Sequence, residues 1–263
     1  MASVHSPFVI NDRLKIDDLR VSTSDDDRET AIILLTATVL LVTFFYWGKP
    51  GFYLRSGLVD WVADRAGGVL GDYNGLGAYL WWGLTSIGFR VLAPLLIIVF
   101  VLRLRPVEFG FRLKGILRHM PIYVGIYLVM LPVLIWASSL ETFLNFYPFY
   151  DQAGDRSLVF WLYELGYGLQ FVGIEAFFRG FLTFGLARRF GLLGVVIMTV
   201  PYTMIHFSKP APEAFGAIIA GLVLGYLALR SKSFVPGVML HFSVAITMDL
   251  LVISRTGGLG SVF

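Results

Sequence analysis

Long apolar stretches alternate with short polar segments along most of the chain, and this pattern predicts a bundle of membrane-spanning helices. A helix needs about 20 largely apolar residues to cross the hydrocarbon core of a bilayer. Seven stretches qualify: residues 30–48, 78–102, 118–138, 158–182, 190–207, 213–229 and 234–254. We therefore expect an all-α polytopic membrane helix bundle with about seven transmembrane helices, in which the last four hold most of the intramembrane polar groups.

The polar segments divide the chain into four parts. Residues 1–29 are polar and contain an acidic run in place of an early apolar core, so we expect a cytoplasmic segment and no cleavable signal peptide. Residues 30–154 are expected to form accessory helices and loops, residues 155–254 the core helices, and residues 255–263 a C-terminal tail. Because no internal repeat is present, a single membrane domain is the simplest prediction.

Composition supports the membrane assignment and excludes several classes of function. Hydrophobic residues make up 57% of the 263 residues and charged residues 15%, which is too apolar for an ordinary soluble domain of this length. The chain has no cysteine, so disulfides, thiolate metal sites and cysteine nucleophiles are excluded. The net charge is +3, but basic and aromatic residues are not interleaved, so we expect no nucleic-acid partner.

The distribution of basic residues predicts an orientation in the bilayer. In an arrangement of seven spans, thirteen Lys and Arg residues lie in the segments on one side and six in the segments on the other. Basic residues are retained on the cytoplasmic side of membranes. We therefore expect an integral protein of the cell (inner) membrane, with a cytoplasmic N-terminus and an external C-terminus.

Two ionisable residues interrupt the span predicted at 158–182. Glu175 and Arg179 are four residues apart, so they share one helix face and can pair. An ionised group at the centre of a bilayer costs roughly 2.5 to 3.5 kcal/mol on insertion scales, and such residues usually have a function. A structural ion pair between helices is the alternative explanation, and for Arg179 alone it is the favoured one.

Two histidines in later spans complete a possible reactive group. Glu175 and His206 lie at similar distances from the turn at 188–189, which places them at the same depth, and Tyr202 precedes His206 by one helical turn. His241 lies on the last span. A glutamate can deprotonate water, and a histidine can orient that water or donate a hydrogen bond to an oxyanion. The same three groups can instead hold a divalent metal such as zinc, and both uses indicate hydrolysis.

Other polar residues have less distinctive interpretations. Asp249 follows His241 by eight residues, so the two lie loosely on one side of the helix but about 12 Å apart in depth. Asp249 can support the site, face a water-filled cavity or pair with Arg90 of the second span. His119 and Glu164 are expected at the membrane interface, because both lie near the predicted ends of spans.

At these positions the sequence resembles the CPBP intramembrane proteases, named for CAAX protease and bacteriocin processing and also called Abi or type II CAAX prenyl endopeptidase-like. That family has Glu-Glu-x-x-x-Arg, then Phe-x-x-x-His, then His-x-x-x-Asn or Asp, each on a transmembrane helix. The corresponding segments here are Ile174 to Arg179, Tyr202 to His206, and His241 to Ala245. The resemblance covers roughly residues 155–250, and three motifs in order at compatible spacings strongly indicate the family's fold.

The resemblance implies a catalytic set and also shows two departures from the family pattern. It implies Glu175, His206 and His241 as catalytic residues, with Arg179, Tyr202 and Asp249 in support. If a metal is used, the same three catalytic residues would bind it. The family's first glutamate, generally assigned as the base that activates water, is replaced by Ile174. The third motif has Ala245 where Asn or Asp is expected.

Two hypotheses of function follow, and the sequence leaves both open. In the first, the chain is an intramembrane endopeptidase of membrane-associated protein or peptide substrates: Glu175 activates water, His206 positions it and His241 stabilises the oxyanion. In the second, the chain is a catalytically inactive scaffold or chaperone that binds partner helices. A transporter is disfavoured, because the sequence shows no inverted repeat and no paired broken helices.

Overall fold

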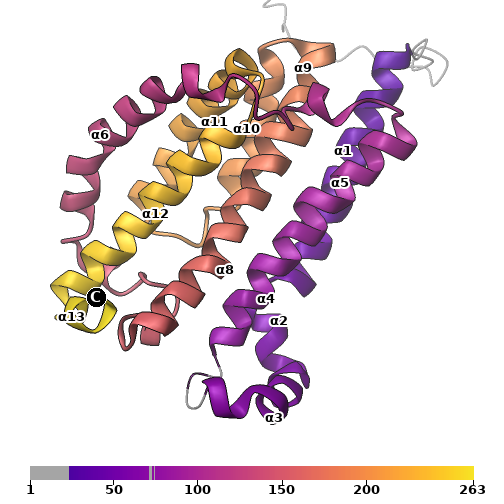
Figure 1. Cartoon of the computed structure of the whole chain (residues 1–263). Helices are drawn as coiled ribbons and strands as arrows, with labels where there is room; N and C mark the ends of the chain where they lie inside the picture. The colour runs from indigo at the N-terminus through magenta and orange to yellow at the C-terminus, as the bar shows by residue number, and fades with distance from the viewer. Residues whose placement is uncertain (1–23, 71–72, 74) are drawn as a thin grey trace, which may run out of the picture.

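A computed structural model describes residues 24–70, 73 and 75–263, and every regular element in these residues is a helix (Figure 1). Most of the predicted N-terminal segment 1–29 lies outside the described residues. Within the described part of the chain, six helices are long and apolar enough to cross a membrane. The predicted all-α polytopic bundle is confirmed.

The six long helices include bends and π-helical turns. They are Asp25–Gly48, Leu76–Val101, Met120–Ala137, Ser157–Phe190, Ala211–Ser231 and Val235–Arg255. Within them lie α1 (Asp25–Thr43), α4 (Leu76–Ile87), α5 (Ala93–Leu96), α6 (Met120–Ala137), α8 (Ser157–Glu175), α9 (Gly185–Phe190), α11 (Ala211–Ser231) and α12 (Val235–Arg255). The shorter helices are α2 (Pro50–Arg55), α3 (Leu58–Leu70), α7 (Glu141–Leu144), α10 (Leu193–Met204) and α13 (Leu259–Val262).

The outer faces of these helices carry a surface suited to lipid. At a rise of about 1.5 Å per residue, a helix of 21 residues such as α12 reaches about 30 Å, the thickness of the hydrocarbon core. Large apolar side chains are exposed there, including Leu35 at 68%, Phe100 at 71% and Val129 at 73%. Soluble monomers rarely expose continuous apolar surface of this extent. The chain is an integral membrane protein.

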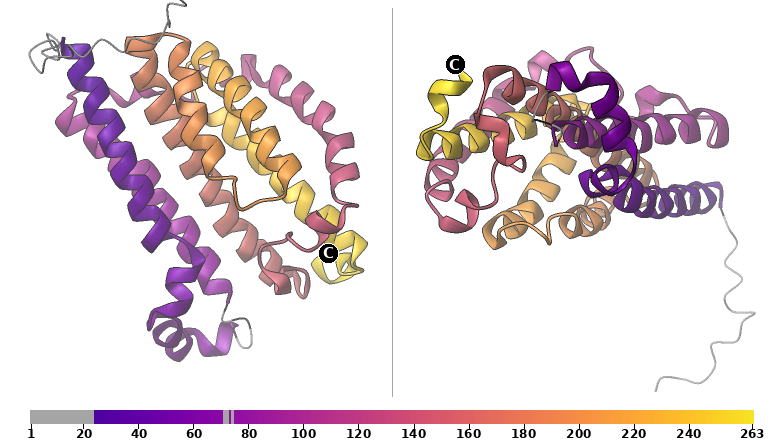
Figure 2. Two further views of the ribbon diagram at one scale, coloured as in Figure 1. Left: turned by 180° about the vertical axis from the view of Figure 1, so that it is seen from behind. Right: turned by 90° about the horizontal axis from the view of Figure 1, so that it is seen from below.

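The helix Ser157–Phe190 forms the centre of the bundle. In its most apolar window 83% of the residues are buried, against 17% to 39% in the other five long helices. The pair formed by α1 and α4–α5 lies on one side of it, and α10, α11, α12 and α6 lie on the other (Figures 1 and 2). This central position explains how the helix can keep charged residues away from lipid.

Glycines allow the helices around the centre to approach closely. A Cβ atom added to Gly166 of α8 would lie 2.6 Å from the backbone carbonyl oxygen of Tyr79 on α4. Cβ atoms added to Gly221 and Gly225 of α11 would lie 2.7 Å from Thr199 and 2.6 Å from Val195, both on α10. The glycines of α11 therefore form a face that packs against α10, as small-residue faces do in membrane bundles.

Ion pairs join three segments at the end of the bundle where α1 begins. Arg188 Nε lies 3.1 Å from Glu29 Oε2, and Arg188 Nη1 lies 3.3 Å from Glu108 Oε2. Arg189 Nη2 lies 2.7 Å from Asp27 Oδ1. The C-terminus lies at the opposite end (Figure 1). The start of α1, the connection between α5 and α6, and α9 therefore share one end, as the basic segments of the sequence predict.

The predicted span at 190–207 is the one that differs most from expectation. The helix α10 begins at Leu193 and ends at Met204, and residues 205–208 form turns. The connection to α11 lies at a level inside the bundle, before the far end of α8 (Figure 2). The helix thus ends six residues before Pro210, and the turns lead to Pro210, the N-cap residue of α11.

Candidate active site

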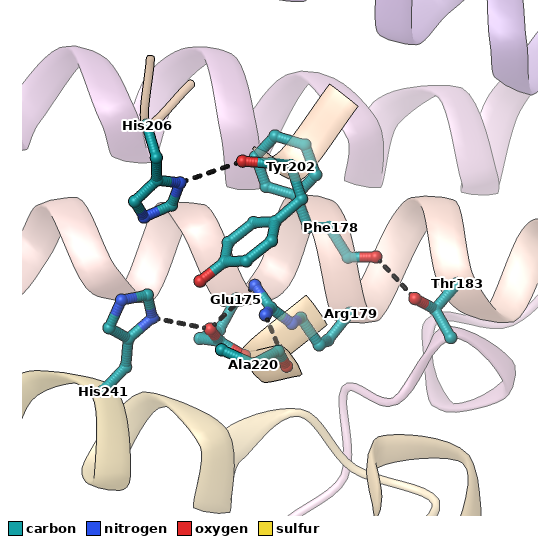
Figure 3. A network of polar contacts seen from close by, with 8 residues as sticks. All are labelled: Glu175, Phe178, Arg179, Thr183, Tyr202, His206, Ala220 and His241. Carbon is teal, nitrogen blue, oxygen red and sulfur yellow. Dashed lines mark hydrogen bonds and ion pairs between the residues drawn. The ribbon is translucent and has the colours of Figure 1, made fainter. Parts of the chain in front are cut away.

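Glu175 is the last residue of α8 and is fully buried. The helix continues directly as a π-helical segment, Ala176–Phe184, in which the Thr183 hydroxyl donates a hydrogen bond of 2.8 Å to the Phe178 carbonyl (Figure 3). Single-turn π-helical insertions occur frequently at functional sites. The backbone therefore changes its winding immediately after the candidate acid.

Arg179 ties the acid to two other helices. Its Nη1 atom lies 3.1 Å from Glu175 Oε1, so the contact predicted from their spacing is present. Its Nη2 atom donates to the Ala220 carbonyl of α11 at 3.3 Å, and its guanidinium lies 3.7 Å from the ring centre of Tyr202 on α10. Both side chains of the ion pair are fully buried, where opposite charges interact strongly. Arg179 therefore holds Glu175, α10 and α11 together.

His241 contacts the same carboxylate oxygen from α12. Its Nδ1 atom lies 2.9 Å from Glu175 Oε1 (Figure 3). The other oxygen, Oε2, lies against Gly237, where an added Cβ atom would be only 2.6 Å away. The His241 side chain is 16% exposed, whereas that of Glu175 is 0% exposed. The imidazole is thus the more accessible member of this pair.

His206 lies in the turn after α10 and is buried. Its Nδ1 atom is 3.0 Å from the Tyr202 carbonyl oxygen, and its ring packs on the Tyr202 ring at 4.9 Å between centres. A carbonyl oxygen only accepts hydrogen bonds, so Nδ1 carries the proton and Nε2 of the neutral ring is an acceptor. Figure 3 shows the Tyr202 hydroxyl directed toward the two imidazoles. Tyr202 therefore links Arg179, His206 and His241.

Three residues that were not predicted from the sequence, Lys209, Glu213 and Tyr147, form a largely buried polar cluster beside the turn that carries His206. Lys209 Nζ lies 2.5 Å from Glu213 Oε1 and 3.1 Å from the Tyr147 hydroxyl, which itself donates to Glu213 Oε2 at 2.5 Å. Burial, followed by the charge of Glu213, raises the pKa of Tyr147 well above its ordinary value. The spacing of four between Lys209 and Glu213 was the available signal in the sequence. Tyr147 is distant in sequence and gave none.

Asp249 belongs to a different cluster from Glu175. The Tyr163 hydroxyl donates to Asp249 Oδ2 at 3.1 Å, and Glu164 lies against the same acid. Glu164, which was expected at the membrane interface, is only 1% exposed, so its carboxyl group is covered by other parts of the bundle. Arg90, the other suggested partner of Asp249, lies instead with its guanidinium 3.6 Å from the ring centre of Phe44.

Residues 156–247 match the family described as type II CAAX prenyl endopeptidase Rce1-like. This part of the chain is an Rce1-like domain. No curated protein and no solved structure matches the chain.

The Rce1-like domain accounts for the motif-bearing part of the chain and agrees with the resemblance to CPBP proteases. Its family is one of CAAX-type intramembrane proteases. Glu175, Arg179, His206 and His241 all lie inside the matched range, whereas Asp249 lies two residues beyond it. The matched range covers about a third of the chain and excludes the α1–α6 region.

Two positions of the Rce1-like domain lack the polar groups that the motifs lead one to expect. Ile174 is buried next to Glu175 at the place of the first glutamate, and Ala245 is buried one turn after His241. Both side chains are apolar and take no part in hydrogen bonding. Any chemistry in this domain must therefore be carried out with one carboxylate at the site rather than two.

The side chains of the site do not fit a metal ion. Among the described residues, no three His, Asp or Glu side chains lie together in a way that could hold one. The reason is visible at Glu175, where Oε1 is shared by Arg179 and His241 and Oε2 faces the backbone of Gly237.

Proposed function

We propose that the chain is an intramembrane endopeptidase that hydrolyses peptide bonds in membrane-associated protein or peptide substrates. The observation that carries the proposal is the 2.9 Å contact between Glu175 and His241, in which the acid is fully buried and the imidazole is partly exposed. A base that activates water must reach that water, and the partly exposed His241 imidazole is the member of the pair suited to this role. In hydrolytic sites that use an imidazole base, a carboxylate commonly orients the imidazole, and Glu175 is placed for that role.

The proton path follows from this arrangement. The Nδ1–H group of His241 donates a hydrogen bond to Glu175, which leaves Nε2 without a proton. The Nε2 atom takes a proton from water as the water oxygen attacks the substrate carbonyl carbon. Glu175 stabilises the imidazolium that forms, and Arg179 supports the carboxylate from the other side. When the intermediate collapses, the C–N bond breaks and His241 returns the proton to the leaving amine. The products are a carboxylic acid, which keeps the second water proton, and an amine; transfer of that proton to the amine gives a carboxylate and an ammonium group.

The remaining polar groups position the reactants. The Nε2 atom of His206 is an acceptor, so it orients the attacking water through the second water proton. The Tyr202 hydroxyl, which points to the same space, donates to the carbonyl oxygen as that oxygen gains negative charge (Figure 3). In this scheme the Glu175–His241 pair takes the role of the glutamate that Ile174 replaces.

The site would act within a defined membrane orientation. The end of the bundle where α1 begins carries the basic connection between α5 and α6 and the basic helix α9. By the positive-inside rule this end lies in the cytoplasm, and we propose the cell (inner) membrane as the location.

The test uses the full chain in liposomes, and a membrane-protein extract of the cells that express the chain supplies the candidate substrates. Hydrolysis is read by mass spectrometry as incorporation of heavy oxygen from water into new C-termini. We expect Glu175→Gln and His241→Ala each to lower the rate by roughly 100- to 10,000-fold, the usual contribution of acid–base catalysis. Tyr202→Phe should lower it roughly 100-fold by removing one oxyanion donor.

Matched controls separate chemistry from folding. Glu164→Gln changes the same residue type on the same helix, where the acid is also buried but lies outside the site. His119→Ala changes a histidine outside the site, at the start of α6. Both controls should retain cleavage within a few fold. Equal activity in the wild type, Glu175→Gln and His241→Ala would overturn the proposal. The apolar Ile174 and Ala245 would then favour a scaffold that binds partner helices.

A further inference from the structure

A cavity opens at the end of the bundle where α6 begins and α11 ends. It has a volume of about 670 Å³, within the range of small-molecule binding sites. Five cationic side chains line it, and no Asp or Glu is among its lining residues. The cations are Arg112, Lys114, Arg118, Arg230 and Lys232. The cavity is therefore electrostatically suited to an anion.

The basic residues of this cavity differ from other basic residues at the same end of the bundle. Arg105, Arg188 and Arg189 each contact a carboxylate, at distances from 2.7 to 3.3 Å. The pKa of the Glu108 carboxyl is lowered, and the largest cause is the hydrogen bond that Arg105 donates to it. Within the part of the chain that the structure describes, none of the five cavity cations forms such a pair. The positive-inside rule explains why this end has many basic residues, but it does not explain why five of them line one cavity.

Apolar groups next to the cavity indicate that the anion belongs to a lipid. Leu113 and Leu117 alternate with the basic residues of the α5–α6 connection, and they are 70% and 80% exposed. Tyr123 and Leu227 line the cavity from α6 and α11. Exposed leucines between basic side chains are typical of segments that lie in the headgroup region. A soluble anion would not require this apolar border.

We propose that this cavity binds the phosphate-bearing headgroup of an anionic phospholipid, with its acyl chains along the apolar faces of α6 and α11. Basic pockets between membrane helices on the cytoplasmic side recognise such headgroups. None of Glu175, Arg179, Tyr202, His206 and His241 lines the cavity, and its occupancy does not depend on whether the Glu175 site is catalytic. The headgroup joins α6, outside the matched domain, to α11, inside it.

The test is a titration of the detergent-solubilised full chain with three probes: short-chain phosphatidylglycerol, short-chain phosphatidylcholine and inorganic phosphate. Binding is followed by native mass spectrometry and by the rise in melting temperature. The cavity variant combines Lys114→Gln, Arg118→Gln and Arg230→Gln, three exposed positions where substitution should not disturb folding. The control variant combines Arg105→Gln, Arg188→Gln and Arg189→Gln, which removes the same charge from the same end.

We expect phosphatidylglycerol to bind the wild-type chain and the control variant with affinities within about threefold of each other. The cavity variant should bind roughly 100-fold more weakly, since each basic residue contributes about a fivefold effect near a membrane surface. Equal weakening in both variants would show a general charge effect and overturn the proposal. Equal binding of phosphatidylcholine, or binding of inorganic phosphate as tight as that of phosphatidylglycerol, would overturn it too. If the cavity variant melts early without lipid, Arg118→Gln alone provides the same comparison.

Discussion

Two groups of buried acids lie between α8 and α12, and they differ in their partners. The Glu175 cluster, formed by Glu175, Arg179 and His241, combines a carboxylate with a guanidinium and an imidazole. The Glu164 cluster, formed by Glu164, Tyr163 and Asp249, brings two carboxyl groups together with a tyrosine hydroxyl. In the Glu164 cluster, three carboxyl oxygens have no hydrogen-bond partner among the described residues.

The comparison shows that burial of an acid does not by itself mark a reactive site. A buried charge is tolerated when it is paired, and Glu175 is paired through Oε1 with Arg179 and His241. Its Oε2 atom has no hydrogen-bond partner among the described residues, so the cation is what distinguishes this cluster. Glu164 and Asp249 lack a cation, so the expected role for them is structural. The partly exposed imidazole is the feature that makes the Glu175 cluster suited to chemistry.

The largest effect on stability is expected from removing the cation of the Glu175 cluster. Arg179→Met leaves the fully buried Glu175 without a counter-charge, which should lower the free energy of unfolding by about 3 to 5 kcal/mol. Arg90→Met is the matched control, because Arg90 is also buried but contacts an aromatic ring rather than an acid. Denaturation of both variants in mixed micelles measures the difference. Equal losses would show that the Glu175 pairing contributes nothing specific.

A smaller effect is expected where α12 passes the Glu175 carboxylate. In Gly237→Ala the new Cβ would lie 2.6 Å from Oε2, so the carboxylate must shift and its contact with His241 must loosen. We expect a loss of about 1 to 3 kcal/mol in the free energy of unfolding, together with slower cleavage. Gly216→Ala on α11 is the control, since an added Cβ there meets nothing within 4 Å. An unchanged cleavage rate in Gly237→Ala would contradict the role of the Glu175–His241 contact.

The smallest effect, and one of opposite sign, is expected in the Glu164 cluster. Asp249→Asn supplies an N–H donor to the Glu164 carboxyl oxygens, which have no partner among the described residues, so stability should rise by up to about 1 kcal/mol. The same change of carboxyl to amide at Glu175 should destabilise, because Arg179 then loses its counter-charge. Melting curves of the two variants test the signs directly. A large loss in Asp249→Asn would mean that Asp249 carries a needed charge.

Much of the fold was predictable from the sequence because the signals are local. Six of the seven predicted spans are long apolar helices, and the seventh, 190–207, was overestimated because the apolar residues Ile205 and Phe207 continue past the end of α10 into the turn. The contact between Glu175 and Arg179 was predictable from a spacing of four. The motif-bearing region was recognised for the same reason, since its motifs are short segments.

The partners of Asp249 were not predictable, and the reason is geometric. Its position in sequence allowed support of the site, a cavity or Arg90, and the structure places it with Tyr163 and Glu164. Which face of α12 meets which face of α8 depends on how both helices are rotated in the bundle. The π-helical winding that begins at Ala176 changes that rotation again, and a period of 3.6 does not reveal it.

By itself the sequence determined the apolar spans, the separation of basic residues between the two ends, and the positions of one glutamate and two histidines on late spans. These depend on hydropathy and helical periodicity, which act over neighbouring residues. Tertiary structure alone decided that His241 meets Glu175, that Lys209 and Tyr147 brace the turn of His206, and that five cations surround one cavity. Those contacts join residues far apart in the chain, and only the packing of helices brings them together.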